Sequence, residues 1–83
     1  MSTETDIERL ILDELLPGKG RTRIDPDDSL FGLGILDSLA FLRLIALLEK
    51  QFAVTIEDGE VIPENFETIN RIKAFVERKR GKN

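Results

Sequence analysis

The sequence predicts an all-α fold: a small four-helix bundle with three longer helices, one short helix and a long first loop. Three segments of the chain space their apolar residues three or four positions apart, as one face of a helix requires. The sequence contains no internal repeat, no heptad array and no glycine-rich phosphate loop. Its 83 residues suffice for one modest core, so we expect a single domain over residues 1–83, with its core at about 3–79 and a basic tail at 80–83.

The first helix is expected from about Glu4 to Leu16. Thr3, with Asp6 three residues later, approximates a capping box, and Pro17-Gly18 ends the helical pattern. The apolar face of this helix consists of Ile7, Leu10, Ile11 and Leu15. Its other face, made of Glu8, Arg9, Asp13 and Glu14, is interpreted as solvated surface.

A long crossing loop is expected from Pro17 to Leu36. This stretch contains four glycines and two prolines and has no sustained apolar period. Such a loop must be pinned inside a compact domain, and the apolar residues able to do so are Ile24, Leu30, Phe31, Leu33 and either Ile35 or Leu36. Asp28-Ser29 is a candidate start for a single helical turn. Gly32 and Gly34 would permit a positive φ or a close backbone approach, or they are ordinary turn residues.

The second helix is expected from about Ser38 to Gln51. Placing each residue at the helical step of about 100° divides its apolar residues into two stripes. The stripe expected to face the core consists of Phe41, Leu44, Ile45, Leu48 and Phe52. The nearly opposite stripe consists of Leu39, Leu42 and Ala46, with Arg43 and Lys50 beside it. We favour a docking surface for partner proteins over the alternative, in which another element of the fold covers this second stripe.

The last third of the chain predicts one short helix and one longer helix. The stretch from Ala53 to Glu67 has no Lys or Arg, and we expect a short helix between Asp58 and Phe66, with core contacts from Val54, Ile56, Val61, Ile62 and Phe66. The acids here are interpreted as a solvated edge, with steering of basic partners as the alternative. Thr68 fits the N-cap of a helix that reaches about Lys79, with an apolar face of Ile69, Ile72, Phe75 and Val76. The basic residues at its end complement the helix dipole.

Composition excludes most catalytic classes. The chain has no Cys and no His, so thiol nucleophiles, disulfides, common zinc sites and imidazole catalysis are all absent. No nucleophile and base occur as an evident pair, so we expect no catalytic residues, no metal site and no enzymatic activity. The net charge of −4 opposes nucleic-acid binding, the apolar runs are too short to insert into a membrane, and the polar N-terminus does not fit a secretory signal. We expect a cytoplasmic monomer.

Ser38 stands where the long loop gives way to the most apolar run of the chain. Asp37 and Ser38 are both residue types that cap a helix N-terminus, so one interpretation is a capped helix alone. A hydroxyl at a helix N-terminus also suits attachment of a phosphodiester, because backbone N–H groups and the helix dipole favour negative charge there.

The motif Asp37-Ser38-Leu39, preceded by Gly34 and followed by a helical run, resembles the acyl and peptidyl carrier proteins. The resemblance extends from Thr3 to Lys79. It implies that Ser38 carries 4′-phosphopantetheine, transferred from coenzyme A, and that the end of this arm holds an acyl or aminoacyl group as a thioester. The protein would then be a phosphoprotein of a biosynthetic pathway.

The resemblance also implies a set of partners. A phosphopantetheinyl transferase would modify Ser38, with Asp37 near its metal ion and Leu39 as a contact. A ligase or synthase would load the arm, and further enzymes would process the tethered group. The docking residues expected on the second helix are Leu39, Leu42, Arg43, Ala46 and Lys50.

Two departures indicate which carriers are most similar. Carriers of fatty-acid synthesis usually read Leu-Gly-x-Asp-Ser-Leu and place several acids on the outward face of the second helix. Here Gly34 stands one residue further from Asp37, and Glu49 is the only acid in the helix. The sequence looks more like the D-alanyl carriers and other free-standing aminoacyl or specialised carriers, which favours a dedicated pathway.

Two other classes compete with the carrier interpretation. In a non-carrying helical adaptor, Ser38 would be only a cap, and the outward face of the second helix would bind a partner helix. A small DNA-binding domain fits less well, because the stretch from Leu39 to Phe52 offers only two cations.

Overall fold

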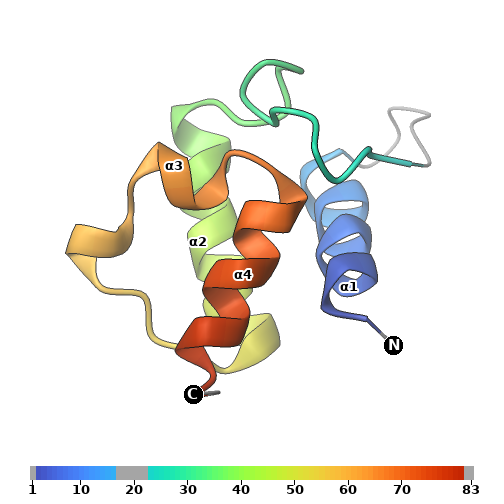
Figure 1. Cartoon of the computed structure of the whole chain (residues 1–83). Coiled ribbons are helices and arrows are strands. Elements are labelled where there is room, and N and C mark those ends of the chain that lie inside the picture. The colour runs from blue at the N-terminus through green and yellow to red at the C-terminus, as the bar shows by residue number, and fades with distance from the viewer. Residues whose placement is uncertain (1, 17–22, 82–83) are drawn as a thin grey trace.

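The computed structural model describes residues 2–16 and 23–81, and every regular element within them is helical. The order is α1 (Thr3–Leu10), a π-helical turn η1 (Ile11–Leu15), α2 (Ser38–Phe52), a 3₁₀ turn η2 (Asp58–Glu60), α3 (Pro63–Phe66) and α4 (Ile69–Lys79). Helix α1 packs against α4, α3 packs against α4, and η1 packs against α2. The loop before α2 crosses one end of the bundle (Figure 1). The predicted all-α fold is confirmed.

The first helical segment differs from its prediction in its cap and in its second half. Ser2, not Thr3, is the N-cap, and its hydroxyl accepts a hydrogen bond from Thr5 N–H at 3.0 Å. From Ile11 onward the helix widens, and Leu16 N–H donates to the carbonyl of Ile11 at 3.1 Å, five residues back. The predicted stop at Pro17-Gly18 lies outside the described residues.

One apolar core joins all the helices. The predicted inward stripe of α2 faces it, with Leu44, Leu48 and Phe52 buried and Phe41 and Ile45 partly buried. Helix α4 begins after the predicted N-cap Thr68, whose hydroxyl accepts from Arg71 N–H at 3.0 Å, and its four predicted core residues are all buried. Two expected core contacts are wrong: Leu33 and Ile62 are 40% and 42% exposed. Both lie in segments without a helical period, where the sequence gives no face to assign.

The described part of the first loop is pinned to both α1 and α4. Glu8 Oε2 accepts from Ile24 N–H at 2.7 Å and from Arg23 Nε at 3.3 Å, so the interpretation of Glu8 as solvated surface is wrong. At α4, Asn70 N–H donates to the Pro26 carbonyl at 3.1 Å, and the Asn70 side chain donates to Asp27 at 2.7 Å. These bonds anchor the loop, so Ile24, Leu30, Ile35 and Leu36 are all buried.

The segment after α2 is held by its own acids. Helix α2 ends at Phe52, and its C-cap, Ala53, has a left-handed backbone with φ of 55°. Glu49 Oε2 accepts from Ile56 N–H at 2.8 Å and turns the chain toward η2. The predicted single short helix is two short pieces, η2 and α3, separated by Val61 and Ile62.

Glu60 links η2 to the C-terminal turn of α4. Its carboxylate accepts two hydrogen bonds from Lys79 Nζ, at 2.9 and 3.1 Å, and one from Glu57 N–H at 2.9 Å. The hydrogen bond from Lys79 is the main cause that holds the pKa of Glu60 below its ordinary value near 4.5. Because the folded state favours the ionised carboxylate, this pair stabilises the fold fully above about pH 4.5 and ceases to do so as the pH falls through the lowered pKa.

We therefore expect Glu60→Gln to lower the thermal unfolding midpoint at neutral pH, and the difference from wild type to shrink as the pH falls below 4.5. Thermal unfolding across a pH series measures both effects. Glu64→Gln is the matched control, because it removes the charge of an exposed acid on α3 and leaves the pair with Lys79 intact. A loss in Glu60→Gln that persists in acid would contradict this role for the pair.

Candidate functional site

Ser38 is the first residue of α2, and Asp37 is its N-cap. Asp37 has an extended backbone, and its Oδ1 accepts a hydrogen bond from Ala40 N–H at 2.8 Å. The Asp37 carbonyl accepts from Phe41 N–H at 2.8 Å. The interpretation of Ser38 as the helix cap is therefore wrong, since the residue before it does that work.

The Ser38 hydroxyl is exposed and forms no hydrogen bond with the described residues. The first two backbone N–H groups of the helix, those of Ser38 and Leu39, also lack a protein partner within this part of the chain. An oxygen on Ser38 thus stands beside unpaired donors at the positive end of a 15-residue helix. This arrangement fits a negatively charged group attached to that oxygen.

A tight turn delivers the chain to Asp37. Leu33 N–H donates to the Ser29 carbonyl at 2.9 Å, and Gly32 N–H donates to the Ser29 hydroxyl at 3.0 Å, so the expected turn is present. Gly34 has φ of 78°, a conformation that glycine adopts without strain. Ile35 and Leu36 N–H groups then both donate to the Leu30 carbonyl, at 3.0 and 3.2 Å. Two consecutive buried residues therefore fix where Asp37 emerges.

The outward stripe of α2 is uncovered. Leu39 is 80% exposed and Leu42 is 60% exposed, and Arg43, Ala46 and Lys50 are exposed beside them. No described element covers the stripe, which removes the alternative interpretation for this part of the chain. The structure brings the five predicted docking residues onto the helix that begins at Ser38.

Two charged residues of α2 interact with other parts of the fold. Arg43 pairs with Glu14 of η1 at 3.6 Å. Glu49, the only acid of α2, is bonded to Ile56 N–H, which the sequence did not reveal. The exposed face of α2 is consequently apolar and basic, with no acid of its own directed to a partner.

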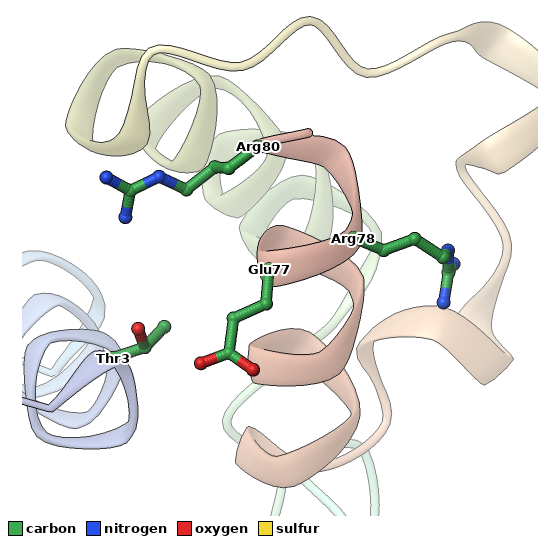
Figure 2. A pocket seen from close by; sticks show the side chains of 4 residues that line it. All are labelled: Thr3, Glu77, Arg78 and Arg80. Atoms are coloured by element: carbon green, nitrogen blue, oxygen red, sulfur yellow. The ribbon is translucent and has the colours of Figure 1, made fainter. Parts of the chain in front are cut away.

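An open hollow lies away from this site. It has a volume of about 530 Å³ and is lined by Thr3, Glu77, Arg78 and Arg80. Figure 2 shows Thr3 of α1 facing Glu77 across the gap, while Arg78 points to the other side of α4, where it lies over the ring of Phe75. Figure 1 places the end of α4 opposite the start of α2. The hollow is therefore not part of the Ser38 site.

The surroundings of Ser38 contain few groups that could catalyse a reaction of its hydroxyl. Among the described residues there is no group of three or more acids that could hold a metal ion. No histidine or cysteine is present in the chain to activate the hydroxyl. The described residues around Ser38 therefore offer a hydroxyl with no evident base beside it. Within residues 2–16 and 23–81, every helix is too short or too polar to cross a lipid bilayer.

Comparison with known proteins shows what this chain resembles. Residues 12–76 match the family described as "Phosphopantetheine attachment site". The D-alanyl carrier protein of Lactococcus lactis subsp. lactis (strain IL1403) is 37% identical over 70 residues, which cover 84% of this chain and 89% of that protein. The probable acyl carrier protein PigG of Serratia sp. (strain ATCC 39006) is 32% identical over 75 residues, covering 90% of this chain and 85% of that protein.

The assignment of Asp37 rather than Ser38 as the N-cap predicts different effects of the two residues on stability. We expect Asp37→Ala to lower the free energy of unfolding by about 1 kcal/mol, because it removes the N-cap of α2. Ser38→Ala removes an exposed hydroxyl that caps nothing, so its effect should stay within about 0.5 kcal/mol. Denaturant unfolding of the two variants tests this order. If Ser38→Ala were the more damaging change, the cap assignment would be wrong.

Proposed function

This chain belongs to the phosphopantetheine-attachment family of carrier proteins, and on that premise we propose that Ser38 is the residue that is modified. The protein is a carrier and not an enzyme. It holds an acyl or aminoacyl group on covalently attached 4′-phosphopantetheine, whose terminal thiol supplies the thioester chemistry. We propose that all of residues 1–83 act as one carrier domain.

The exposed, unbonded hydroxyl of Ser38 carries this proposal. In the modification, Ser38 Oγ bonds to the phosphorus that bears the pantetheine, and the bond from that phosphorus to the adenosine bisphosphate part of coenzyme A breaks. The hydroxyl proton passes to a base of the transferase. The free N–H groups of Ser38 and Leu39 lie where they can stabilise the resulting phosphodiester.

Asp37 has a second role in this proposal. Its Oδ1 caps the helix, while its Oδ2 accepts no hydrogen bond from the described residues. We assign this free oxygen to the metal side of the transferase complex. One exposed carboxylate can serve both purposes because its two oxygens face different partners.

The outward stripe of α2 is the proposed docking surface, formed by Leu39, Leu42, Arg43, Ala46 and Lys50. Carriers of this family require partner enzymes, and we assign three to this surface: a phosphopantetheinyl transferase, a loading ligase or synthase, and enzymes that process the cargo. We further propose that the protein works as a cytoplasmic monomer. Its net charge of −4 opposes nucleic-acid binding.

The cargo that we favour is an aminoacyl group of a dedicated pathway. Several similar proteins bear the name D-alanyl carrier protein. The outward face of α2 supports a dedicated pathway. An enzyme that recognises acidic carriers through a basic docking surface would find no acid on this face and would meet the exposed Lys50 with like charge.

Intact-protein mass tests the attachment site. Incubation with coenzyme A, magnesium and a broad-specificity phosphopantetheinyl transferase should add the mass of one phosphopantetheine to the wild type and nothing to Ser38→Ala. The chain has two other serines, Ser2 and Ser29, and both supply controls. Ser2→Ala is the closer match, because Ser2 also stands at a helix start. Modification of a correctly folded Ser38→Ala would refute the assignment.

Replacing one of two exposed alanines with glutamate tests the docking surface. Ala46 on α2 and Ala74 on α4 are both exposed, so glutamate at either position should leave the fold intact. We expect Ala46→Glu to lower kcat/KM for modification of Ser38 by at least about tenfold, because docking would bury the new charge. Ala74→Glu should change it little. Equal effects of the two changes would contradict docking through α2.

A further inference from the structure

A row of phenylalanine rings occupies the core beside the start of α2. Phe31 of the loop, Phe41 of α2, Phe66 of α3 and Phe75 of α4 follow one another with ring centroids 5.6, 5.5 and 5.0 Å apart. Each pair meets edge to face, at interplanar angles of 62° to 68°. Edge-to-face pairs at these distances stabilise a core beyond the apolar area they bury. We call these four residues the phenylalanine row.

Phe41 is the member of the phenylalanine row that lies nearest to Ser38 along the chain. It lies three residues after Ser38, on the first turn of α2, and its side chain is partly buried. Its ring contacts Phe31 on one side and Phe66 on the other. The seam between α2 and the preceding loop and the seam between α2 and α3 are therefore each filled by a ring pair.

The row continues inward without a break. Phe66 is fully buried and Phe75 is 1% exposed, so a chain that entered beside Phe41 would meet two further packed rings. Three hollows of the described residues lie elsewhere, lined largely by charged side chains of α1, η1 and α4. None of their lining residues belongs to the first turn of α2 or to α3.

We propose that the phenylalanine row closes the core to the tethered cargo, so that this carrier takes short acyl or aminoacyl groups and holds them in solvent. The inference rests on Ser38 as the attachment point. A long alkyl chain would have to displace packed rings to be buried, and left outside it would expose apolar surface to water. A short polar group such as an aminoacyl group loses nothing by remaining in solvent.

The test compares cargoes of different length on the wild-type protein. A broad-specificity transferase would load Ser38 from acetyl-, alanyl- and octanoyl-coenzyme A, and intact mass would verify each product. Two quantities are then measured: the rate of thioester cleavage by hydroxylamine, relative to the same acyl-pantetheine free in solution, and the thermal unfolding midpoint. We expect the relative rates of all three to agree within about twofold and the midpoints to coincide, because a group that does not bind the folded state cannot stabilise it.

Protection of the octanoyl thioester by tenfold or more, or a raised midpoint for that form alone, would overturn the proposal. Failure to attach any of the groups to Ser38 would instead contradict the attachment site itself, and the mass measurement separates these two failures. The wild-type comparison decides the proposal even if a core variant does not fold.

Phe41→Ala tests whether the phenylalanine row is what keeps the cargo out of the core. Removing this ring should open both seams, so that the octanoyl form, but not the alanyl form, becomes protected and more stable to heat. Phe52→Ala is the matched control, because Phe52 is a buried ring of the same helix that lies outside the row. It should give no protection. A folded Phe41→Ala that leaves octanoyl as reactive as in the wild type would show that the row does not exclude the chain.

Discussion

The hydrogen bond from Ala40 N–H to the Asp37 carboxylate is the interaction on which the site depends. It fixes the first residue of α2, and every later residue of that helix takes its direction from this start at about 100° per step. If Ser38 were the cap, its hydroxyl would be turned back onto the helix and consumed there. The helix would also begin one residue later. Because Asp37 serves as the cap, Ser38 remains on the first turn with its oxygen free. The buried pair Ile35 and Leu36 holds Asp37 in place from the other side.

Three acids perform one physical task in the irregular parts of the chain. Glu8, Glu49 and Glu60 each accept a hydrogen bond from a backbone N–H of a non-helical segment, those of Ile24, Ile56 and Glu57. A loop has no neighbouring strand or helical turn to satisfy such groups, and a carboxylate satisfies them strongly. Each of these carboxylates therefore has at least one oxygen bonded within the fold, although a count of charges in the sequence would treat all three as solvated. Glu49, the only acid of α2, is one of the three, and the outward stripe of the helix carries no acid in its sequence.

Local signals in the sequence were sufficient for the two longer helices α2 and α4. They also singled out Ser38 as a candidate, and its attachment role stays a prediction. The periodicity of 38–52 and 69–79, the cap at Thr68 and the two stripes of α2 are all short-range features, and the structure agrees with them.

The predictions were wrong where residues close in sequence do not determine the local structure. Ser2 and Thr3 are both suitable caps by residue type, and no local pattern marks the widening that begins at Ile11. An acid that holds a loop looks the same in sequence as a solvated one, so Glu8 was misread. The phenylalanine row joins four separate segments of the chain, and no local pattern marks it.

The pair formed by Arg43 and Glu14 has a consequence for recognition. The charge of Arg43 is already partly balanced by the Glu14 carboxylate 3.6 Å away. A partner acid that approaches Arg43 on the proposed docking surface therefore competes with Glu14, and where it takes the place of Glu14 one carboxylate is exchanged for another. Such an exchange contributes less to affinity than capture of an unpaired cation, because the original pair must be given up first. A partner that buries Arg43 and separates it from Glu14 without offering an acid would leave the guanidinium charge unpaired, which is unfavourable. On the docking surface proposed for α2, the pair therefore lowers what Arg43 contributes to the affinity of a partner.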